Sequence, residues 1–371
     1  MKRADKKSFA PAISPLSGAH RRILKSLAEK YEIEAAHLGK WNRTLWANAI
    51  GRPFRRMDAM LSVCATDRIE IHEDPIFIIG HWRSGTTLLH NLLTQLPNTS
   101  YPSTFQSVFP NNLFFLQFIF KIAMRWFMPS ERPADHVRID PDYPQEEEIA
   151  LGNEIEHSFY YWFYFPKNTI EFLEKYLMDE DPDVLEKWKI NYLRFIKRAM
   201  GNIGGSRFIS KNPPNTFRIK TLLGLFPNAK FIFLHRNPYE VFFSSKRFFW
   251  QTIHGLKFQE IDENTFDAFI LKVYQEMMDR YVRDRGTIPK GNLIELRYQD
   301  LCHRPYSIFR EITERCGIGV DADTSRKVQS FIEQGLSHVV KTYDFPRDYL
   351  EMINNRWGIY FDLFDYNKII S

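Results

Sequence analysis

The chain has 371 residues, 44% of them hydrophobic and 15% aromatic, so it is long enough to bury the core of a large enzyme domain. Its formal net charge of +5 arises from lysines and arginines dispersed along the sequence, which suits an anionic ligand and offers no clustered basic run for nucleic acid. The three cysteines lie far apart and no apolar signal core follows Met1, so we expect a cytoplasmic protein without disulfides.

Four apolar segments predict the strands of a parallel sheet. They cover residues 76–79, 207–210, 230–234 and 292–296, and each is followed by a turn signal and separated from the next by helical stretches. Residues 1–70 are charged and helical in pattern, and predict an N-terminal extension packed on a single domain of residues 71–371. The sequence therefore predicts an α/β fold with a central parallel sheet flanked by helices.

The first predicted strand runs into a turn that is typical of a phosphate loop. Gly80 and Gly85 have the outer spacing of a Walker A loop, and a helix start at this point directs backbone N–H groups at an anion. A P-loop NTPase has a lysine after the second glycine, whereas this chain has Thr86 and Thr87 there. The loop's one cation is Arg83, which precedes Gly85 by two residues.

A second pair of anion-binding side chains follows the third predicted strand. Arg236 comes directly after that strand, and Ser244 lies eight residues later on a predicted helix. A guanidinium and a hydroxyl in these places can converge on one phosphate from two sides.

The run Arg83-Ser84-Gly85-Thr86-Thr87, together with the Arg236 and Ser244 pair, resembles the donor site of sulfotransferases across residues 75–345. The resemblance implies a P-loop NTPase-like fold and the donor 3′-phosphoadenosine 5′-phosphosulfate (PAPS). By the same resemblance the first run holds the 5′-phosphosulfate, and the pair holds the 3′-phosphate. Residues 101–165 correspond to the insertion in which the acceptor docks.

Further positions follow from the same resemblance. Lys211 matches the lysine that bridges to the leaving oxygen, and Tyr298 matches a tyrosine near the adenine, while Lys341 and Tyr343 correspond to weaker donor contacts. Pro213 falls where cytosolic sulfotransferases have their catalytic histidine. Since proline cannot accept a proton, the general base must lie elsewhere, and a glutamate after the phosphosulfate loop is the family candidate.

An acidic helix start after Pro144 supplies the candidate bases. At ~100° per residue, Glu146, Asn153 and His157 fall on one helical face, which makes Glu146 the first choice. Glu148 is the second choice and Glu147 the third. His157 stays open as a histidine alternative, and a solvated first turn would explain the glutamates equally simply.

Residues 112–129 form the most apolar segment. Gln117, Lys121 and Arg125 interrupt it at every fourth position, and its uncharged part is too short to span a bilayer. A buried helix, a lid over the acceptor and a surface resting on a membrane all fit this pattern, and we prefer the lid. The many aromatic residues at 101–128 and 158–165 favour a sterol, steroid or lipid alcohol as acceptor over a carbohydrate or phenol.

Other classes of protein fit less well. No metal-binding motif is present in the sequence, so we expect transfer without a metal and a small-molecule acceptor rather than a nucleic acid. A small-molecule kinase would need a lysine at position 86, and a non-catalytic nucleotide-binding protein would not need Lys211 beside an acidic helix. The sequence leaves the oligomeric state open.

Overall fold

The structure is a computed structural model that describes residues 11–66, 69–71, 74–129, 131, 139–335 and 345–369. Contacts divide the chain into two compact units, which are described separately. The helical unit comprises Met1–Glu70, Pro102–Ile203 and Arg247–Phe266, and the sheet unit comprises Ile71–Tyr101, Gly204–Lys246 and Asp267–Ser371. The predicted single domain over residues 71–371 with an insertion at 101–165 stays a prediction.

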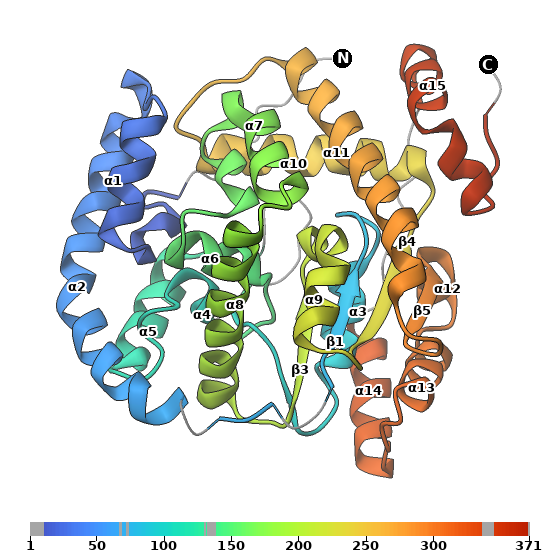
Figure 1. The fold of residues 1–371 in the computed structure, drawn as a ribbon, viewed down its shortest axis with the longest axis horizontal. Helices are drawn as coiled ribbons and strands as arrows, with labels where there is room; N and C mark the ends of the chain where they lie inside the picture. The colour runs from blue at the N-terminus through green and yellow to red at the C-terminus, as the bar shows by residue number, and fades with distance from the viewer. Residues whose placement is uncertain are drawn as a thin grey trace. The chain divides into compact units, whose positions relative to one another are not determined.

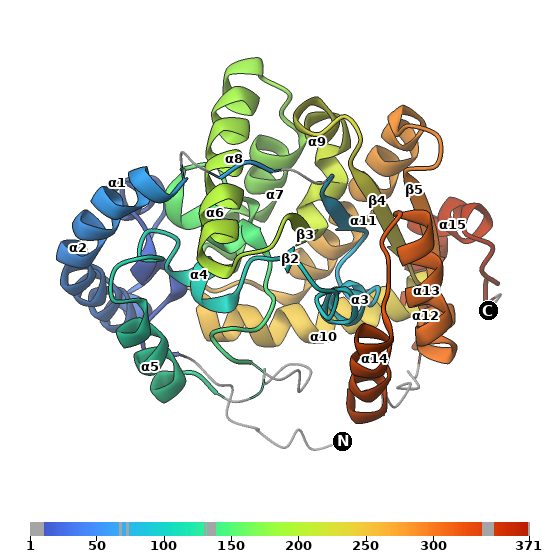
Figure 2. The same cartoon turned by 90° about the horizontal axis from the view of Figure 1, so that it is seen from below.

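The sheet unit contains five parallel strands in the order β2-β3-β1-β4-β5. Figure 1 labels the four longer strands, and Figure 2 labels β2. The strands are β1 (Ile76–Ile79), β2 (Thr99–Ser100), β3 (Arg207–Lys211), β4 (Lys230–His235) and β5 (Leu293–Arg297). The predicted α/β class with a central parallel sheet is confirmed. Sequence reasoning missed β2, whose two residues are too few to show a hydrophobic period.

Alternating strand residues build the two sides of the sheet. On one side, Ile78 of β1 and Ile232 of β4 belong to a core cluster with Leu89 and Phe309. On the other side, Phe233 of β4 stacks on Tyr281 at 3.6 Å between ring centroids. The helices of this unit are α3 (Thr86–Leu93), α9 (Ile219–Leu225), α12 (Tyr298–His303), α13 (Pro305–Arg315), α14 (Ala322–Gly335) and α15 (Arg347–Leu363). Helices α10 (Pro238–Leu256) and α11 (Glu263–Asp284) contribute residues to both units.

A buried ionic cluster lies in the interior of the helical unit. Arg198 donates to Asp58 at 2.7 Å and to Glu154 at 3.3 Å, which joins three helices of this unit. Because these charges are buried, each needs its partner to offset its desolvation. The unit contains α1 (Arg21–Lys30), α2 (Leu38–Thr66), α4 (Thr104–Val108), α5 (Gln117–Phe127), α6 (Glu147–Glu154), α7 (Thr169–Leu173) and α8 (Pro182–Ile203). Within the described ranges, no helix combines the length and the apolar character needed to cross a bilayer.

Candidate active site

The loop after β1 leaves the sheet through a glycine that no other residue could replace without strain. Gly80 has φ +123°, and a Cβ at this position would lie 2.3 Å from the carbonyl oxygen of Leu234. Its N–H donates to Thr216 Oγ1 at 2.9 Å, so the backbone hydrogen bond lost at the strand end is replaced by a side chain. The turn is therefore held tightly against β4.

The loop ends at Gly85, which is the N-cap of α3 and has φ +94°. A Cβ here would lie 2.3 Å from Cδ2 of Tyr298, so the tyrosine ring lies directly against the loop. Helix α3 starts at Thr86, and its first N–H groups have no partners within the helix itself. This strand, loop and helix start have the local form of an anion-binding site.

Arg83 is the centre of a polar cluster in the sheet unit. Its backbone is left-handed, with φ +69°, which is uncommon for a residue with a side chain. Its Nε donates to Ser244 Oγ at 3.1 Å, and Arg236 Nη1 donates to the Arg83 carbonyl at 3.2 Å. The structure thus brings together Arg83, Arg236 and Ser244, three residues that the sequence resemblance assigned to the donor.

Arg236 is held by two further neighbours. Its Nε donates to Glu240 Oε2 at 2.5 Å, and its guanidinium carbon lies 4.3 Å from the centroid of the Tyr298 ring. Burial raises the pKa of Tyr298 above its usual range, so the phenol stays neutral beside the arginine. The guanidinium is therefore oriented by a carboxylate on one side and by an aromatic face on the other.

Lys211 lies at the carboxyl end of β3, buried to 2% exposure and in register with Ile78 of the adjacent β1. The carboxyl ends of parallel strands meet at one edge of a sheet, where α/β proteins usually bind their ligands. Lys211 and the β1 loop share that edge with Arg236, which follows β4, and Tyr298, which follows β5. Pro213 opens a short 3₁₀ helix directly after β3.

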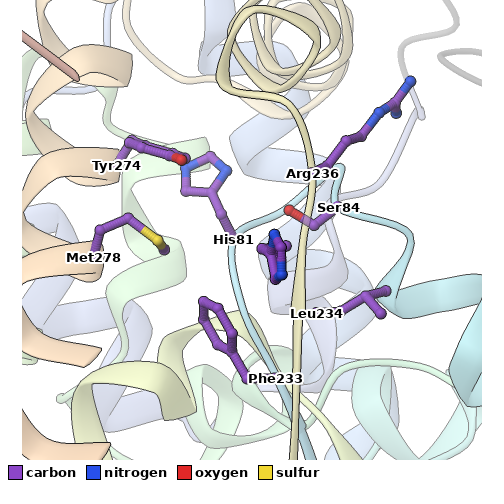
Figure 3. A pocket seen from close by; sticks show the side chains of 8 residues that line it. His81, Ser84, Phe233, Leu234, Arg236, Tyr274 and Met278 are labelled. Atoms are coloured by element: carbon purple, nitrogen blue, oxygen red, sulfur yellow. The ribbon is translucent and has the colours of Figure 1, made fainter. Parts of the chain in front are cut away.

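A small pocket in the sheet unit adjoins this cluster (Figure 3). Its lining comprises His81, Ser84, Phe233, Leu234, His235, Arg236, Tyr274 and Met278. In Figure 3 the His81 ring points toward Tyr274, whereas Arg236 extends away from it. Burial lowers the pKa of His81 to about 4, and burial together with the charge of Arg297 lowers that of His235 to about 4. Both imidazoles are neutral at pH 7 and contribute no charge to an anion site.

The three candidate glutamates lie at the start of α6 in the helical unit and have different surroundings. Glu147 is fully buried and accepts a hydrogen bond from the Tyr192 hydroxyl at 2.8 Å. Glu148 is fully buried too, and its Oε1 accepts from the Phe159 N–H at 3.0 Å. Glu146 is the N-cap residue, is partly exposed, and accepts a hydrogen bond from the Tyr160 hydroxyl.

The predicted polar face through Glu146, Asn153 and His157 is wrong. Helix α6 ends at Glu154, and Ile155 after it is extended, so His157 lies beyond the helix. Asn153 is buried and donates to the carbonyl of Val108 at 2.9 Å. The His157 ring packs at 5.6 Å from Tyr176, and burial lowers its pKa. Glu146 and His157 therefore share no helix.

The aromatic residues after α6 lie in the protein interior and do not line an open acceptor site. Residues 159–163 are a 3₁₀ helix whose side chains are all buried. Trp162 stacks on Phe163 at 4.2 Å and meets Phe249 edge-on at 5.0 Å. This part of the aromatic content supports the interior of the helical unit, and so gives little information on the acceptor.

Two predicted donor contacts, Lys341 and Tyr343, lie outside the described residues. Among the residues that the structure describes, Glu34, His37 and Glu260 offer three ligand atoms within 4.8 Å of one another. Lys167 pairs with Glu34 at 2.8 Å, and Lys257 pairs with Glu260, so these carboxylates are already neutralised by lysines. This group therefore makes a poor metal site.

Sequence reasoning missed several residues that orient the predicted ones. Glu240 follows Arg236 by four residues, and this i,i+4 spacing of opposite charges is a signal that could have identified the pair. Thr216 lies 136 residues from Gly80, and Tyr160 lies 14 residues from Glu146. No sequence period connects such distant partners, so only the fold reveals them.

Similarity to a known family covers most of the sheet unit's loops described above. A model described as "Sulfotransferase family" matches residues 75–322, which include the β1 loop, Lys211, Arg236 and Tyr298. The chain belongs to the sulfotransferase family. It is therefore a transferase enzyme, as the resemblance of its loops predicted.

Individual sulfotransferases agree with this assignment. The chain is 30% identical to proteins named omega-hydroxy-beta-dihydromenaquinone-9 sulfotransferase Stf3 from Mycobacterium bovis and Mycobacterium tuberculosis, over 80% of this chain and 76% of each relative. The crystal structure of sulfotransferase STF9 from Mycobacterium avium shares the fold with a TM-score of 0.68 at 18% identity, covering 99% of both chains. Sulfotransferase STF1 from Mycobacterium tuberculosis H37Rv shares it with a TM-score of 0.62 at 17% identity, covering 91% of this chain and 90% of that one.

Proposed function

We propose that this sulfotransferase transfers the sulfuryl group from PAPS to the hydroxyl of an apolar acceptor, with a lipid alcohol as the favoured class. The observation that carries the donor assignment is the Arg83, Arg236 and Ser244 cluster beside the β1 loop. Two arginines, one hydroxyl and a helix start supply charge and N–H donors for a ligand with two separate anionic ends.

The two ends of the donor have distinct partners in this proposal. The N–H groups and hydroxyls of residues 84–87, with Arg83, bind the 5′-phosphosulfate. Arg236 and Ser244 bind the 3′-phosphate, and Glu240 keeps the Arg236 guanidinium in one orientation through its Nε. Tyr298 packs against Gly85 and beneath Arg236, which suits contact with the adenine. Lys341 and Tyr343 are proposed as additional donor contacts.

Lys211 stabilises the leaving group in the proposed reaction. As the acceptor oxygen attacks sulfur in line, the bond from sulfur to the bridging oxygen breaks, and negative charge grows on that oxygen. A buried lysine at the edge of the sheet can donate a proton in a hydrogen bond to that oxygen where the dielectric is low. The products are adenosine 3′,5′-bisphosphate and a sulfate ester. Arg83, Lys211 and N–H donors supply enough positive charge for transfer without a metal.

Glu146 is the proposed acceptor of the hydroxyl proton. It is the partly exposed member of the three glutamates, whereas Glu147 and Glu148 are fully buried. The Tyr160 hydroxyl, which donates to its carboxylate, can fix the orientation of the base. Glu148 remains the second choice and Glu147 the third, with His157 as the histidine alternative.

The lipid acceptor is favoured by the relatives. Stf3 is named for an omega-hydroxylated dihydromenaquinone, and this chain aligns with four fifths of its length to it. Carbohydrates and phenols are the alternatives.

Two measurements test the proposal. Thermal unfolding with PAPS, adenosine 3′,5′-bisphosphate or ATP with Mg²⁺ should show stabilisation by the 3′-phosphorylated nucleotides, by about 2.7 kcal/mol at a hundred times Kd. Stabilisation by ATP with Mg²⁺, but not by PAPS or adenosine 3′,5′-bisphosphate, would favour a kinase and contradict the donor assignment. Mass spectrometry of sulfated products from a pool of sterols, lipid alcohols, phenols and sugars should yield a sulfated lipid, and donor binding with no product would favour a non-catalytic protein.

A further inference from the structure

Helix α2 has its polar face inside and its apolar face outside. At ~100° per residue, its side chains fall on two opposite faces. The inward face is polar and less than 10% exposed, and consists of Thr44, Asn48, Arg55, Asp58 and Ser62. The outward face is apolar and strongly exposed, and consists of Trp46 (72%), Ile50 (67%), Met57 (44%), Met60 (70%) and Leu61 (47%). An ordinary surface helix has the opposite arrangement.

Buried polar contacts fix this orientation of α2. The Asn48 amide donates to the carbonyls of Ser17 at 2.9 Å and Ala19 at 2.6 Å. Asp58 forms the buried ion pair with Arg198 at 2.7 Å. Rotating the helix to hide its apolar face would turn Asn48 and Asp58 away from these partners. The Ser17 and Ala19 carbonyls and the Arg198 guanidinium would then stay buried without them, at a cost of ~1–3 kcal/mol for each neutral group and more for a charged one. The exposed apolar face is therefore built into the fold.

Helix α5 has the same property and lies beside α2 in the helical unit (Figure 2). Phe54 of α2 meets Phe120 of α5 edge-on, with ring centroids 5.3 Å apart. The polar residues of α5 are held by an acidic segment, with Lys121 at 2.6 Å from Asp142 and Arg125 at 2.8 Å from it. Apart from Arg125, its large exposed side chains are apolar, namely Phe118 (57%), Ile119 (43%), Ile122 (49%), Trp126 (81%) and Phe127 (73%). A buried helix, one of the three alternatives for this segment, is wrong.

The charge near these faces selects an anionic partner. Arg43 and Arg56 are exposed on α2, and Arg52 is partly exposed. The described side chains of α2 and α5 include a single carboxylate, Asp58, which is fully buried. A symmetric dimer through this surface would bring the arginines of two copies near one another, while the carboxylates beside α5, Asp140 and Asp142, are already paired with Lys121 and Arg125. A bilayer with anionic head groups supplies both an apolar layer and the missing negative charge.

We propose that the outward faces of α2 and α5, here called the α2/α5 surface, bind the surface of an anionic lipid membrane. The apolar side chains enter the boundary between head groups and acyl chains, where amphipathic helices lie in the plane of the membrane. Trp46 and Trp126, which are 72% and 81% exposed, suit the interfacial layer that tryptophan prefers. Arg43 and Arg56 contact the head groups. This inference concerns a surface beyond the sulfuryl-transfer site and does not depend on the proposed acceptor.

Co-sedimentation of the full chain with lipid vesicles tests the proposal. The two probes are vesicles of phosphatidylcholine alone and of an equal mixture of phosphatidylcholine and phosphatidylglycerol, both without PAPS. The protein should bind the mixed vesicles more tightly. The double variant I50S/I122S should weaken that binding by roughly tenfold or more, because each isoleucine loses apolar burial in the lipid. Arg56→Gln should weaken it about fivefold on mixed vesicles only.

Matched controls keep the test decisive. The double variant I190S/I359S removes isoleucines of similar exposure, 58% and 69%, outside the α2/α5 surface, and should bind like the wild type. Arg326→Gln removes an exposed arginine of α14 and should also bind normally.

Absence of vesicle binding by the wild type, or an equal loss in I190S/I359S, would overturn the proposal. The proposal would also be overturned if light scattering showed that the wild type is a dimer and that the I50S/I122S variant is a monomer. If I50S/I122S fails to fold, the comparison of Arg56→Gln with Arg326→Gln still decides. None of these measurements requires catalysis. A negative result for membrane binding can therefore be told apart from a negative result for the proposed sulfuryl transfer.

Discussion

Arg83 and Ser244 are joined by a hydrogen bond of 3.1 Å from Nε to Oγ, although 161 residues separate them in the chain. The bond connects the loop after β1 with helix α10, and Arg236 reaches the same loop through the Arg83 carbonyl. Residues assigned to opposite ends of the donor are thus in direct contact. We expect the two ends of PAPS to be recognised as one connected unit.

Ser244→Ala should raise the KM for PAPS by roughly tenfold, since it removes one hydrogen bond to an ionised group. The catalytic rate should change little, because the hydroxyl lies at the predicted 3′-phosphate and not at sulfur. Ser245→Ala is the matched control. Ser245 is buried on the same helix, and its hydroxyl has no hydrogen-bond partner among the described residues. Equal kinetics for the two variants in a steady-state assay would remove Ser244 from the donor site.

Arg236→Ala should raise the KM for PAPS by ~30-fold or more and leave kcat within a few fold. A contact to the 3′-phosphate is remote from the breaking bond, so it stabilises the ground state and the transition state alike. Removal of a bidentate guanidinium loses more than one charged hydrogen bond, each worth ~1.5–3 kcal/mol. An unchanged KM, measured with PAPS as the varied substrate, would contradict the assignment.

Much of the sheet unit could be predicted because its signals are local. Four of the five strands were predicted within a residue at each end, since short apolar runs bounded by turns have few other structures available. The loop after β1 was identifiable because Gly80 and Gly85 occupy backbone conformations that other residues avoid. The same signal could not find Thr216, which depends on the tertiary fold.

The helical unit was harder to predict for a physical reason. On α2 the buried side carries Asn48 and Asp58 and the exposed side is largely apolar, so the usual rule for orienting a helix gives the wrong side. Helix α6 was predicted too long because its periodicity continues past Glu154, where the chain turns to the extended residue Ile155. Tertiary packing overrode the local pattern in both cases.

Lys211→Ala should lower kcat by about a hundredfold or more and change the KM for PAPS much less. The charge on the bridging oxygen grows only as its bond to sulfur breaks, so the lysine acts mainly in the transition state. Lys211→Arg keeps the charge with a different geometry and should recover part of the rate. Single-turnover measurements with bound PAPS separate the chemical step from binding, and a normal rate for Lys211→Ala would leave the lysine with a structural role.

His235 should make the protein less stable in mild acid. Its pKa is about 4 in the folded state, because of burial and the nearby Arg297, and 6.5 when unfolded. Between these values the unfolded chain binds a proton that the folded chain does not, so stability is complete above pH 6.5 and falls as the pH drops toward 4. His235→Phe keeps the stacking on Phe364 and removes this contribution, at most about 3 kcal/mol. The fall in Tm from pH 7 to pH 4.5 should therefore be smaller in the variant than in the wild type, and parallel curves would contradict the prediction.

Glu146→Gln should lower kcat by ~10²–10⁴ and leave stabilisation by adenosine 3′,5′-bisphosphate unchanged. Glutamine keeps the size of the side chain and can still accept the hydrogen bond from Tyr160, but it cannot take the proton of the attacking hydroxyl.

Glu148→Gln is the matched control, two residues further along the chain. Its carboxylate accepts from the Phe159 N–H in the core, a bond that the amide oxygen can replace, so this variant should keep most of the activity. Loss of activity in Glu148→Gln, with Glu146→Gln near wild type and both variants folded, would move the base to Glu148. Near-normal rates in both, with loss in His157→Ala, would make the histidine the base instead.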